Sequence, residues 1–198
     1  MSEPEDPLAQ FNAWFEEAKA GEPSNPNAMT LATATADGRP SARMVLLKDV
    51  DERGFVFYTN TESRKGGELL SNPTAALLFH WKSLDRQVRI EGPVSQVDDA
   101  EADAYFASRD RGARIGAWAS RQSHPMDGRF ELEKRVAEYT AKFNIGEVPR
   151  PDFWTGFRIR HEVVEFWTQG LFRLHERLVY HRGGDGDGDG WRTERIFP

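Results

Sequence analysis

The chain has 198 residues, 38% of them hydrophobic and 12% aromatic, so it is long enough to bury roughly 70% of its unfolded surface in one domain. A net charge of -6, without a long block of Lys and Arg, argues against a nucleic-acid or anionic-membrane surface, because such binding needs many cations to neutralise phosphates. The absence of cysteine excludes disulfides, thiolate metal sites and a cysteine nucleophile.

The N-terminal segment has neither a basic leader nor an apolar core of signal-peptide length, and no run of residues is apolar for long enough to span a membrane. These features predict a cytoplasmic protein. We expect one domain over residues 1–198, with residues 1–6 disordered and the Gly/Asp segment 183–190 a flexible hairpin loop. Alternating Gly and Asp also occur in calcium-binding turns, but such a site needs about six oxygen ligands, and we assign this segment no role.

The predicted elements of the first half are one helix, a group of strands and a short second helix. Apolar residues recur at steps of three and four from Pro7 to Ala20, which predicts an amphipathic helix ended by Gly21. Strands are predicted at 28–36 and 41–50, joined by an Asp-Gly turn, and at 54–60. A short helix is expected over 62–71, followed by strands at 75–81 and 87–97.

The second half begins with helices and returns to strands. Helical patterns occupy 98–108 and 131–143, with a shorter segment at 115–120, and strand patterns cover 156–167, 172–182 and 190–197. Antiparallel strands with helices outside them are typical of a small barrel whose curvature closes its edges. The predicted fold class is therefore α+β, an antiparallel barrel with peripheral helices.

Three basic side chains alternate near the C-terminus. Arg173, His175 and Arg177 would project from one face of a strand, because successive strand residues point to opposite sides. Two guanidinium groups and an imidazole packed together repel each other unless an anion or an aromatic ring lies against them. A solvated strand face explains the spacing equally well, and the nearby Trp167 favours a pocket.

Two further segments place cations where a phosphate could bind. Arg43 and Lys48 flank four apolar residues of a predicted strand, but alternation puts them on opposite faces. The two could bind one phosphate only if the strand has a bulge or if Lys48 lies at its end. Otherwise both are ordinary surface cations. Ser63, Arg64 and Lys65 fall in the first turn of a predicted helix, where free N–H groups favour an anion, although a solvated basic turn is also common.

Other polar residues have weaker patterns. Tyr105 and Arg109 are four residues apart, so on a helix they would share a face and could hold a phosphate, although such pairs often only pack on the surface. Gln87 shares a predicted strand face with Arg89 and Glu91, and could bind a heterocycle edge or belong to a polar outer face. The sequence lacks a dinucleotide-binding glycine loop, a P-loop and hydrolase motifs, and its five histidines show no metal-ligand pairing. We therefore expect chemistry carried by an organic cofactor, without a metal.

Six segments together resemble the pyridoxamine 5'-phosphate oxidase family in order and separation: RMVLLK, FYTNTESRKG, RQVRIEGPV, IGAWASRQS, VEFW and RLHER. The resemblance runs from Asp6 to Pro198. It implies an FMN-binding split barrel that works as a homodimer with each flavin at the subunit interface. It also implies oxidation of pyridoxamine or pyridoxine 5'-phosphate to pyridoxal 5'-phosphate, by hydride transfer to the flavin, with dioxygen as acceptor and hydrogen peroxide as product.

The resemblance also implies roles for individual residues. Arg173 and His175 would be catalytic, because they would orient the pyridine ring and stabilise developing charge. The implied FMN contacts are Arg43, Met44, Val45, Leu46, Leu47, Lys48, Tyr58, Thr59, Arg64, Lys65, Gln87, Gln122, Ser123, Trp167 and Arg177. The implied substrate contacts are Lys48, Tyr105, Arg109, Arg173, Leu174 and His175. The alternatives are a flavin reductase or another FMN oxidoreductase with a different substrate, and a non-catalytic carrier of FMN or pyridoxal phosphate.

The chain departs from the family pattern at several positions. Ala113 stands where the family usually has a serine that contacts the substrate phosphate, and Glu176 stands where it has aspartate. His161 replaces a proline before the EFW strand, and Thr168-Gln169 follow that motif where the family has glutamine directly. A basic, tyrosine-bearing N-terminal segment that closes over substrate in relatives has no counterpart here. We therefore expect weaker substrate binding.

Overall fold

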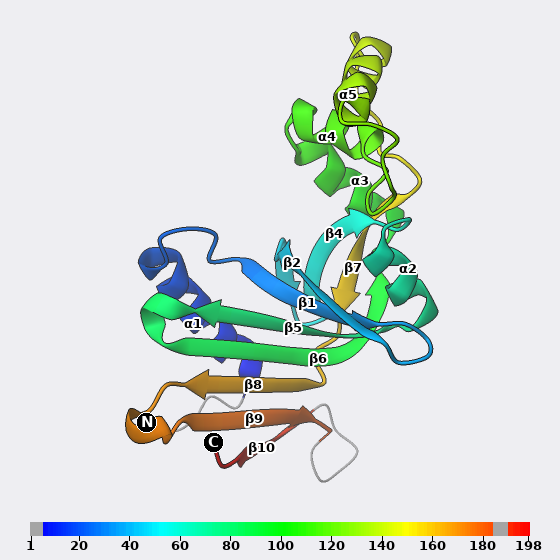
Figure 1. The fold of residues 1–198 in the computed structure, drawn as a ribbon. Helices are drawn as coiled ribbons and strands as arrows, with labels where there is room; N and C mark the ends of the chain where they lie inside the picture. Colours follow the sequence, from blue (N-terminus) through cyan, green and yellow to red (C-terminus); the bar gives the residue numbers. More distant parts are fainter. Residues whose placement is uncertain (1–5, 184–189) are drawn as a thin grey trace.

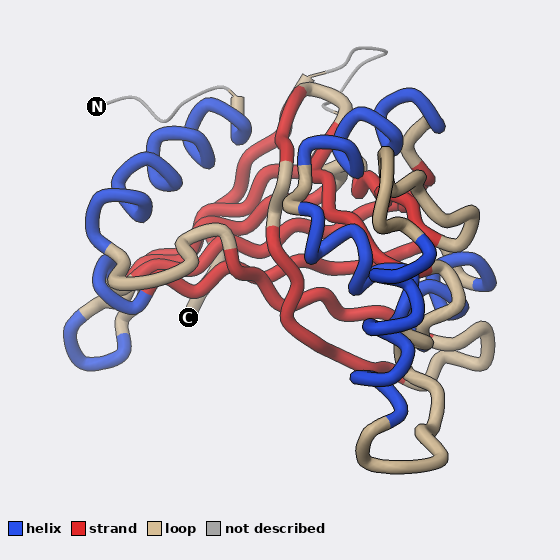
Figure 2. Tube along the Cα trace, turned by 90° about the horizontal axis from the view of Figure 1, so that it is seen from above, coloured by secondary structure: helices blue, strands red, loops and turns tan. Residues whose placement is uncertain are grey.

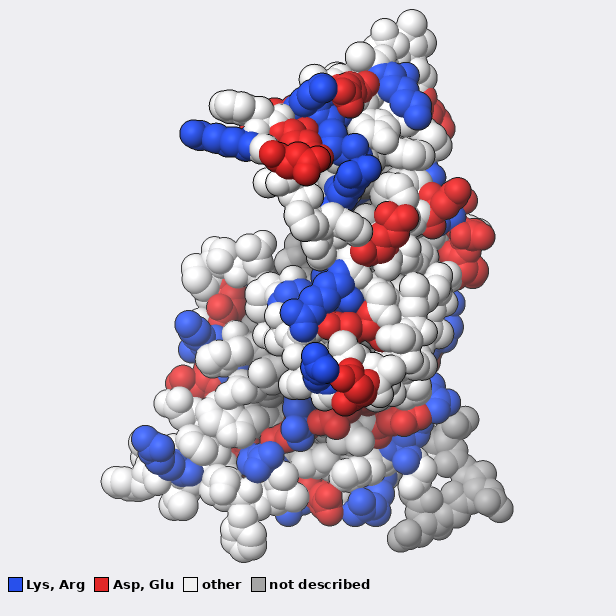
Figure 3. All heavy atoms as spheres, turned by 45° about the vertical axis from the view of Figure 1, so that its right-hand side comes forward, with Lys and Arg blue, Asp and Glu red and all other residues white. Residues whose placement is uncertain are grey.

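The computed structural model describes residues 6–183 and 190–198. Residues 1–5 of the segment 1–6 that was expected to be disordered, and residues 184–189 of the expected loop 183–190, lie outside these residues. The expectation was wrong for Asp6, which is ordered as the cap of the first helix. Within them, no helix combines the length and apolar character needed to cross a membrane. On the face drawn in Figure 3, Lys and Arg side chains lie interspersed with Asp and Glu.

The described residues form a single ten-stranded antiparallel sheet that curls strongly (Figure 1). Its main path runs β10-β9-β8-β6-β5-β1-β2, while β7 pairs with β6 and β4, and β4 pairs with β3. The strands are β1 (Ala28–Ala34), β2 (Pro40–Leu46), β3 (Asp49–Asp51), β4 (Gly54–Asn60), β5 (Thr74–Trp81), β6 (Arg86–Gln96), β7 (Trp154–Ile159), β8 (Val163–Thr168), β9 (Glu176–Arg182) and β10 (Trp191–Arg195). This arrangement confirms the predicted α+β antiparallel barrel.

Strand β6 produces the curl because it pairs with different neighbours along its length. Residues 86–91 pair with β8, and residues 94–96 pair with β7. Gly92 lies between these two regions, where an added Cβ would meet the carbonyl oxygen of Arg160 at 1.9 Å. Only a residue without a side chain allows the backbones to approach so closely.

The core lies on the inner face of the curled sheet. A row of directly paired, buried residues crosses four strands: Phe79, Val88, Phe166 and Leu178. Helix α1 (Pro7–Gly21) covers this face, and its Phe11 ring lies 4.8 Å from Phe55 and 5.2 Å from Phe79, centroid to centroid. The helix begins at the Asp6 cap, whose carboxylate accepts a hydrogen bond from the Leu8 amide.

The remaining helices lie apart from α1. They are α2 (Arg64–Ser71), α3 (Asp99–Ser108), α4 (Arg111–Ala119) and α5 (Glu131–Lys142). The chain also forms two 3₁₀ turns, η1 (Lys82–Leu84), which contacts the end of α1, and η2 (Leu171–Arg173). The strands separate α1 from α3, α4 and α5 (Figure 2). These three helices gather at the end of the molecule where β4 and β7 reach them (Figure 1). They therefore form one wall for anything bound beside β4.

Four predicted elements were wrong in detail. The strand predicted at 156–167 is two strands, β7 and β8, because the chain turns beside Gly92. In this turn the Arg160 amide donates to the Pro93 carbonyl, and the Glu162 amide donates to the Glu91 carbonyl. The strand predicted at 41–50 ends at Leu46, and β3 follows at Asp49. The helical segment predicted at 115–120 spans 111–119.

The predicted strand at 172–182 begins only at Glu176. Phe172 and Arg173 have left-handed backbones, with φ of 57° and 66°, and form the turn η2. Strand alternation therefore does not apply to Arg173 and His175, and the expected single face for Arg173, His175 and Arg177 was wrong.

Candidate functional site

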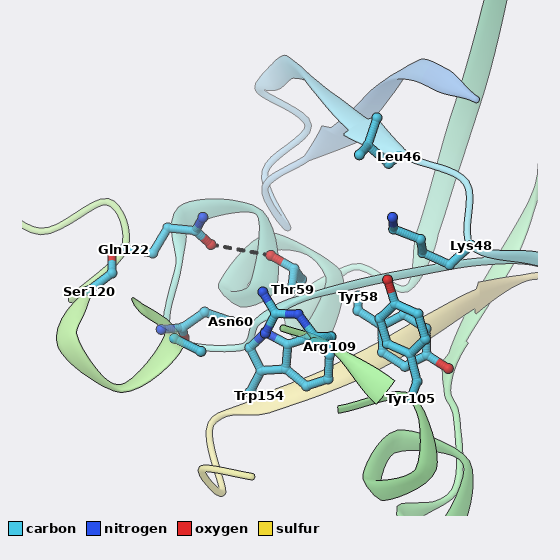
Figure 4. A pocket seen from close by; sticks show the side chains of 11 residues that line it. Leu46, Lys48, Tyr58, Thr59, Asn60, Tyr105, Arg109, Ser120, Gln122 and Trp154 are labelled. Carbon is cyan, nitrogen blue, oxygen red and sulfur yellow. Dashed lines mark hydrogen bonds between the residues drawn. The ribbon is translucent and has the colours of Figure 1, made fainter. Parts of the chain in front are cut away.

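A cavity of about 330 Å³ opens between β4, α3 and the segment after α4 (Figure 4). We call it the cationic pocket. It is lined by Leu46, Lys48, Tyr58, Thr59, Asn60, Tyr105, Arg109, Ala117, Ser120, Gln122 and Trp154. Among the residues that the structure describes, no Asp or Glu lines it, although the chain has 32 acidic residues.

Two cations enter the cationic pocket. Arg109 is half-buried, its guanidinium lies 4.9 Å from the centre of the Trp154 ring, and its buried Nη1 has no hydrogen-bond partner. Burial lowers the pKa of Arg109 from its ordinary value. Lys48 lies beyond the end of β2, and its Nζ is 5.9 Å from the Tyr105 ring. Since a buried donor without a partner is costly, this arrangement favours an anionic ligand.

Parallel aromatic rings form one wall of the pocket. The rings of Tyr58 and Tyr105 are stacked with centroids 3.9 Å apart, and Trp154 stacks on Tyr58 at 5.2 Å. Burial and the nearby Glu101 raise the pKa of Tyr58 to about 12, so its phenol stays protonated. Tyr105 and Arg109 were expected to share a face of one helix, but α3 ends at Ser108, so Arg109 lies just beyond it. Both side chains nevertheless line the cavity.

Lys65 lies behind the pocket in the first turn of α2. Its ammonium donates to Gln122 Oε1 at 3.0 Å, to Thr59 Oγ1 at 3.1 Å and to Ser63 Oγ at 3.3 Å. All three acceptors are neutral. Burial, together with repulsion from Arg43, lowers the pKa of Lys65. Ser63 caps α2 by accepting from the Gly66 amide, so the helix predicted over 62–71 begins two residues later than expected, at Arg64.

A second cavity, of about 420 Å³, lies on the outer face of β6, β8 and β9. We call it the sheet pocket; it is lined by Leu78, Gln87, Arg89, Glu165, Trp167, His175, Arg177 and Pro198. Gln87, Trp167 and Arg177 are direct neighbours across the three strands. The two pockets have no lining residue in common.

Hydrogen bonds fix the basic groups of the sheet pocket. The buried carboxylate of Glu165 accepts from Arg89 Nη2 and from Arg177 Nε, both at 2.6 Å. The His175 ring lies 4.6 Å from Trp167, and its Nδ1 accepts from the Gly170 amide at 3.2 Å. Neutral His175 therefore carries its proton on Nε2.

The structure divides the residues implied by the resemblance into groups. Leu46, Lys48, Tyr58, Thr59, Tyr105, Arg109 and Gln122 line the cationic pocket, whereas Gln87, Trp167, His175 and Arg177 line the sheet pocket. Neither pocket is lined by Arg43, Met44, Val45, Leu47, Arg64, Lys65, Ser123, Arg173 or Leu174. Ser123 follows Gln122 in a neighbouring cavity, and Arg173 and Leu174 are exposed.

Sequence reasoning missed other residues of these pockets. Trp154, Asn60 and Ser120 line the cationic pocket, and no spacing pattern indicated them. Glu165 had a usable signal, because a carboxylate within the otherwise apolar strand β8 indicates a buried ion pair.

A curled antiparallel barrel with a cationic, aromatic pocket is typical of the split-barrel class of proteins. A family model described as pyridoxamine 5'-phosphate oxidase matches residues 15–143, and one for the pyridoxine 5'-phosphate oxidase C-terminal dimerisation region matches residues 154–198. The chain belongs to the pyridoxamine 5'-phosphate oxidase family. Membership supports a flavin cofactor, and the second match supports a homodimer.

Close relatives extend over the whole chain. A pyridoxine/pyridoxamine 5'-phosphate oxidase of Rhodospirillum rubrum is 62% identical over 201 residues, covering 99% of this chain and 98% of that relative. One of Caulobacter vibrioides is 62% identical over 194 residues, covering 98% and 86%. The crystal structure of PhzG from Burkholderia lata, in complex with tetrahydrophenazine-1-carboxylic acid, has a TM-score of 0.90 and 33% identity and covers 98% of this chain and 94% of that one.

Proposed function

We propose that the protein uses FMN to oxidise pyridoxamine 5'-phosphate or pyridoxine 5'-phosphate to pyridoxal 5'-phosphate, with dioxygen as the acceptor and hydrogen peroxide as the product. One observation carries the proposal: the cationic pocket, which no Asp or Glu of the described chain lines, combines Lys48 and Arg109 with a stacked aromatic wall. Such a pocket suits an aromatic ring that bears a phosphate. Relatives that are 62% identical over nearly the whole chain carry the name of this activity.

The residues fit the phosphate of FMN. Lys65 is buried against neutral acceptors at the start of α2, where backbone N–H groups also favour an anion. Lys65 and Arg64 would hold the phosphate with Gln122, and Gln87, Trp167 and Arg177 would meet the ring. When bound, FMN accepts a hydride from the substrate and passes the electrons to dioxygen.

One complete site needs both pockets, and we assign them to two copies of the chain. The turn and C-terminal residues beside the sheet pocket expose large apolar side chains, with Phe172 92% and Phe197 94% exposed. Apolar surface of this kind is typical of a region covered by a partner. The match of residues 154–198 to a dimerisation region agrees with this assignment. In the homodimer, each flavin would lie at the interface.

The substrate would bind between the two copies. Arg109, with its unpartnered Nη1, would hold the substrate phosphate together with Lys48 and Tyr105. Arg173 and His175 of the partner copy would orient the pyridine ring and stabilise charge as the hydride leaves, with Leu174 packed against the ring. Because His175 Nδ1 accepts from the Gly170 amide, neutral His175 would offer its Nε2 proton to the substrate ring. Catalysis would then be mainly positioning and electrostatics.

Anaerobic mixing of the purified flavoprotein with pyridoxamine 5'-phosphate tests the proposal. The yellow absorption of the oxidised flavin should bleach and return when dioxygen is admitted. Unphosphorylated pyridoxamine is the matched control and should bleach the flavin far more slowly, because Arg109 and Lys48 then lack their anion. Bleaching only with a nicotinamide donor would identify a reductase, and no bleaching with any donor would identify a carrier.

A further inference from the structure

One buried carboxylate lies at the centre of the basic residues around α2. Glu68 is 5% exposed, and its Oε2 accepts hydrogen bonds from Thr33 Oγ1 and Ser41 Oγ, both at 2.5 Å. Its two oxygens also bind two guanidinium groups: Arg64 Nε at 2.9 Å from Oε1, and Arg43 Nη2 at 3.3 Å from Oε2. Although burial acts in the opposite direction, the hydrogen bonds from Ser41, Thr33 and Arg64 lower the pKa of Glu68 to about 2.

The same network restrains Arg43 from its other side. Arg43 Nη1 donates to Thr33 Oγ1 at 2.5 Å and to the Leu31 carbonyl at 3.2 Å, and its Nη2 donates to the Ser41 hydroxyl. Arg43 also repels the ammonium of Lys65, and so helps to lower its pKa. Arg64 and Lys65 belong to the first turn of α2, and Arg43 comes from β2. Glu68 pairs with Arg43 and Arg64.

A carboxylate beside a phosphate site is unfavourable by direct repulsion. A carboxylate can still favour phosphate binding if the free energy gained by orienting the arginines exceeds the cost of this repulsion. A guanidinium binds phosphate best with its planar donors fixed in direction, and a side chain already held by a buried partner loses less conformational freedom on binding.

We propose that Glu68 is a positioning residue that holds Arg43 and Arg64 in the orientation in which they bind the FMN phosphate beside Lys65. This inference rests on the proposed function, because it requires the flavin phosphate to bind at α2. Thr33 and Ser41 fix the carboxylate, and the carboxylate fixes the two arginines. Glu68 itself does not touch the cofactor.

Flavin binding with and without the phosphate tests the inference. Quenching of flavin fluorescence by the flavin-free full chain gives a dissociation constant for FMN and one for riboflavin. In Glu68→Gln, we expect FMN to bind at least tenfold more weakly and riboflavin to change less than twofold. Glu62→Gln is the matched control, because it removes the same charge from an exposed residue of the preceding loop and should leave both constants unchanged.

A second variant covers the case in which Glu68→Gln does not fold. Thr33→Val keeps the carboxylate and the side-chain shape but removes one hydroxyl that fixes Oε2. It should weaken FMN binding about threefold without affecting riboflavin. Unchanged or tighter FMN binding in the variants would overturn the inference, as would an equal loss for FMN and riboflavin, which would mean that Glu68 only stabilises the fold. A wild-type protein that binds riboflavin as tightly as FMN would instead refute the assignment of the phosphate to α2.

Discussion

The ammonium of Lys65 lies 3.0 Å from the amide oxygen of Gln122, and this contact joins the first turn of α2 to the segment after α4. Thr59 bonds to both groups, with its hydroxyl 3.1 Å from Lys65 Nζ and 3.2 Å from Gln122 Oε1. The contact therefore couples a buried cation to the wall of the cationic pocket. Among the described residues, the acceptors of this ammonium are all neutral, so a bound phosphate would supply a negative charge beside it.

Replacing Lys65 with methionine should weaken FMN binding by tenfold to a hundredfold, because a hydrogen bond to a charged group contributes about 1.5–3 kcal/mol. Riboflavin binding should change little, since riboflavin has no phosphate for the ammonium to bind. Titration with the two flavins measures both effects. Lys134→Met is a suitable control, because Lys134 is exposed on α5. Equal weakening of both flavins would contradict a phosphate-specific role.

Replacing Arg173 with alanine should leave the bound yellow flavin in place and remove most of the turnover. Arg173 is exposed in the turn η2 and lines neither pocket of its own copy, so flavin binding does not depend on it. Steady-state oxidation of pyridoxamine 5'-phosphate and the flavin content measure the two effects. Arg39→Ala, at an exposed turn, should change neither quantity. Turnover equal to wild type in Arg173→Ala would refute the catalytic assignment.

Local sequence patterns predicted a helix or strand well where residues close in the sequence determine its ends. Strand β4 occupies the predicted residues 54–60, and α2 ends at the predicted Ser71. Turn η2 could not be predicted, because its left-handed residues are Phe172 and Arg173 rather than glycine. Tertiary packing imposes this conformation against the intrinsic preference of both residues.

The composition of each pocket depends on register and chain crossing, which no local pattern encodes. Gln87, Trp167 and Arg177 are distant in sequence and become neighbours only when β6, β8 and β9 pair. The resemblance named these residues but did not indicate that they lie apart from Lys48 and Arg109. Nothing in the sequence indicated that Glu68 is buried, because a Glu on a short helix is usually a surface residue. In the structure, Thr33 of β1 and Ser41 of β2 pack against its carboxylate.

Replacing Gly170 with alanine should lower turnover at least tenfold and change the FMN dissociation constant less than threefold. An added Cβ would lie 1.8 Å from the Leu174 carbonyl oxygen, so the turn carrying Arg173 and His175 must shift. Arg177 lies in the paired part of β9 and should stay in place. Turnover and flavin titration measure both effects. Gly128→Ala is the control, since its Cβ would meet nothing within 4 Å. A shift confined to flavin affinity would contradict this prediction.

His161 should make folding stability depend on pH between about 6.5 and 4. The ring is buried, it stacks on Trp191, and its Nε2 lies 2.9 Å from Arg182 Nη2. Burial, with repulsion from Arg182, lowers its pKa from 6.5 to about 4. The unfolded chain takes up a proton in this range and the folded protein does not, so stability falls as the pH is lowered.

Relative to His161→Gln, the wild-type protein should lose about 3 kcal/mol more of its unfolding free energy between pH 7 and pH 4. Urea denaturation at several pH values measures the difference. Glu68 titrates in both proteins, and its stabilisation is lost at lower pH, from about 4.5 to 2, so it cancels in the comparison. Parallel stability curves for the two proteins would mean that His161 is not held neutral by its surroundings.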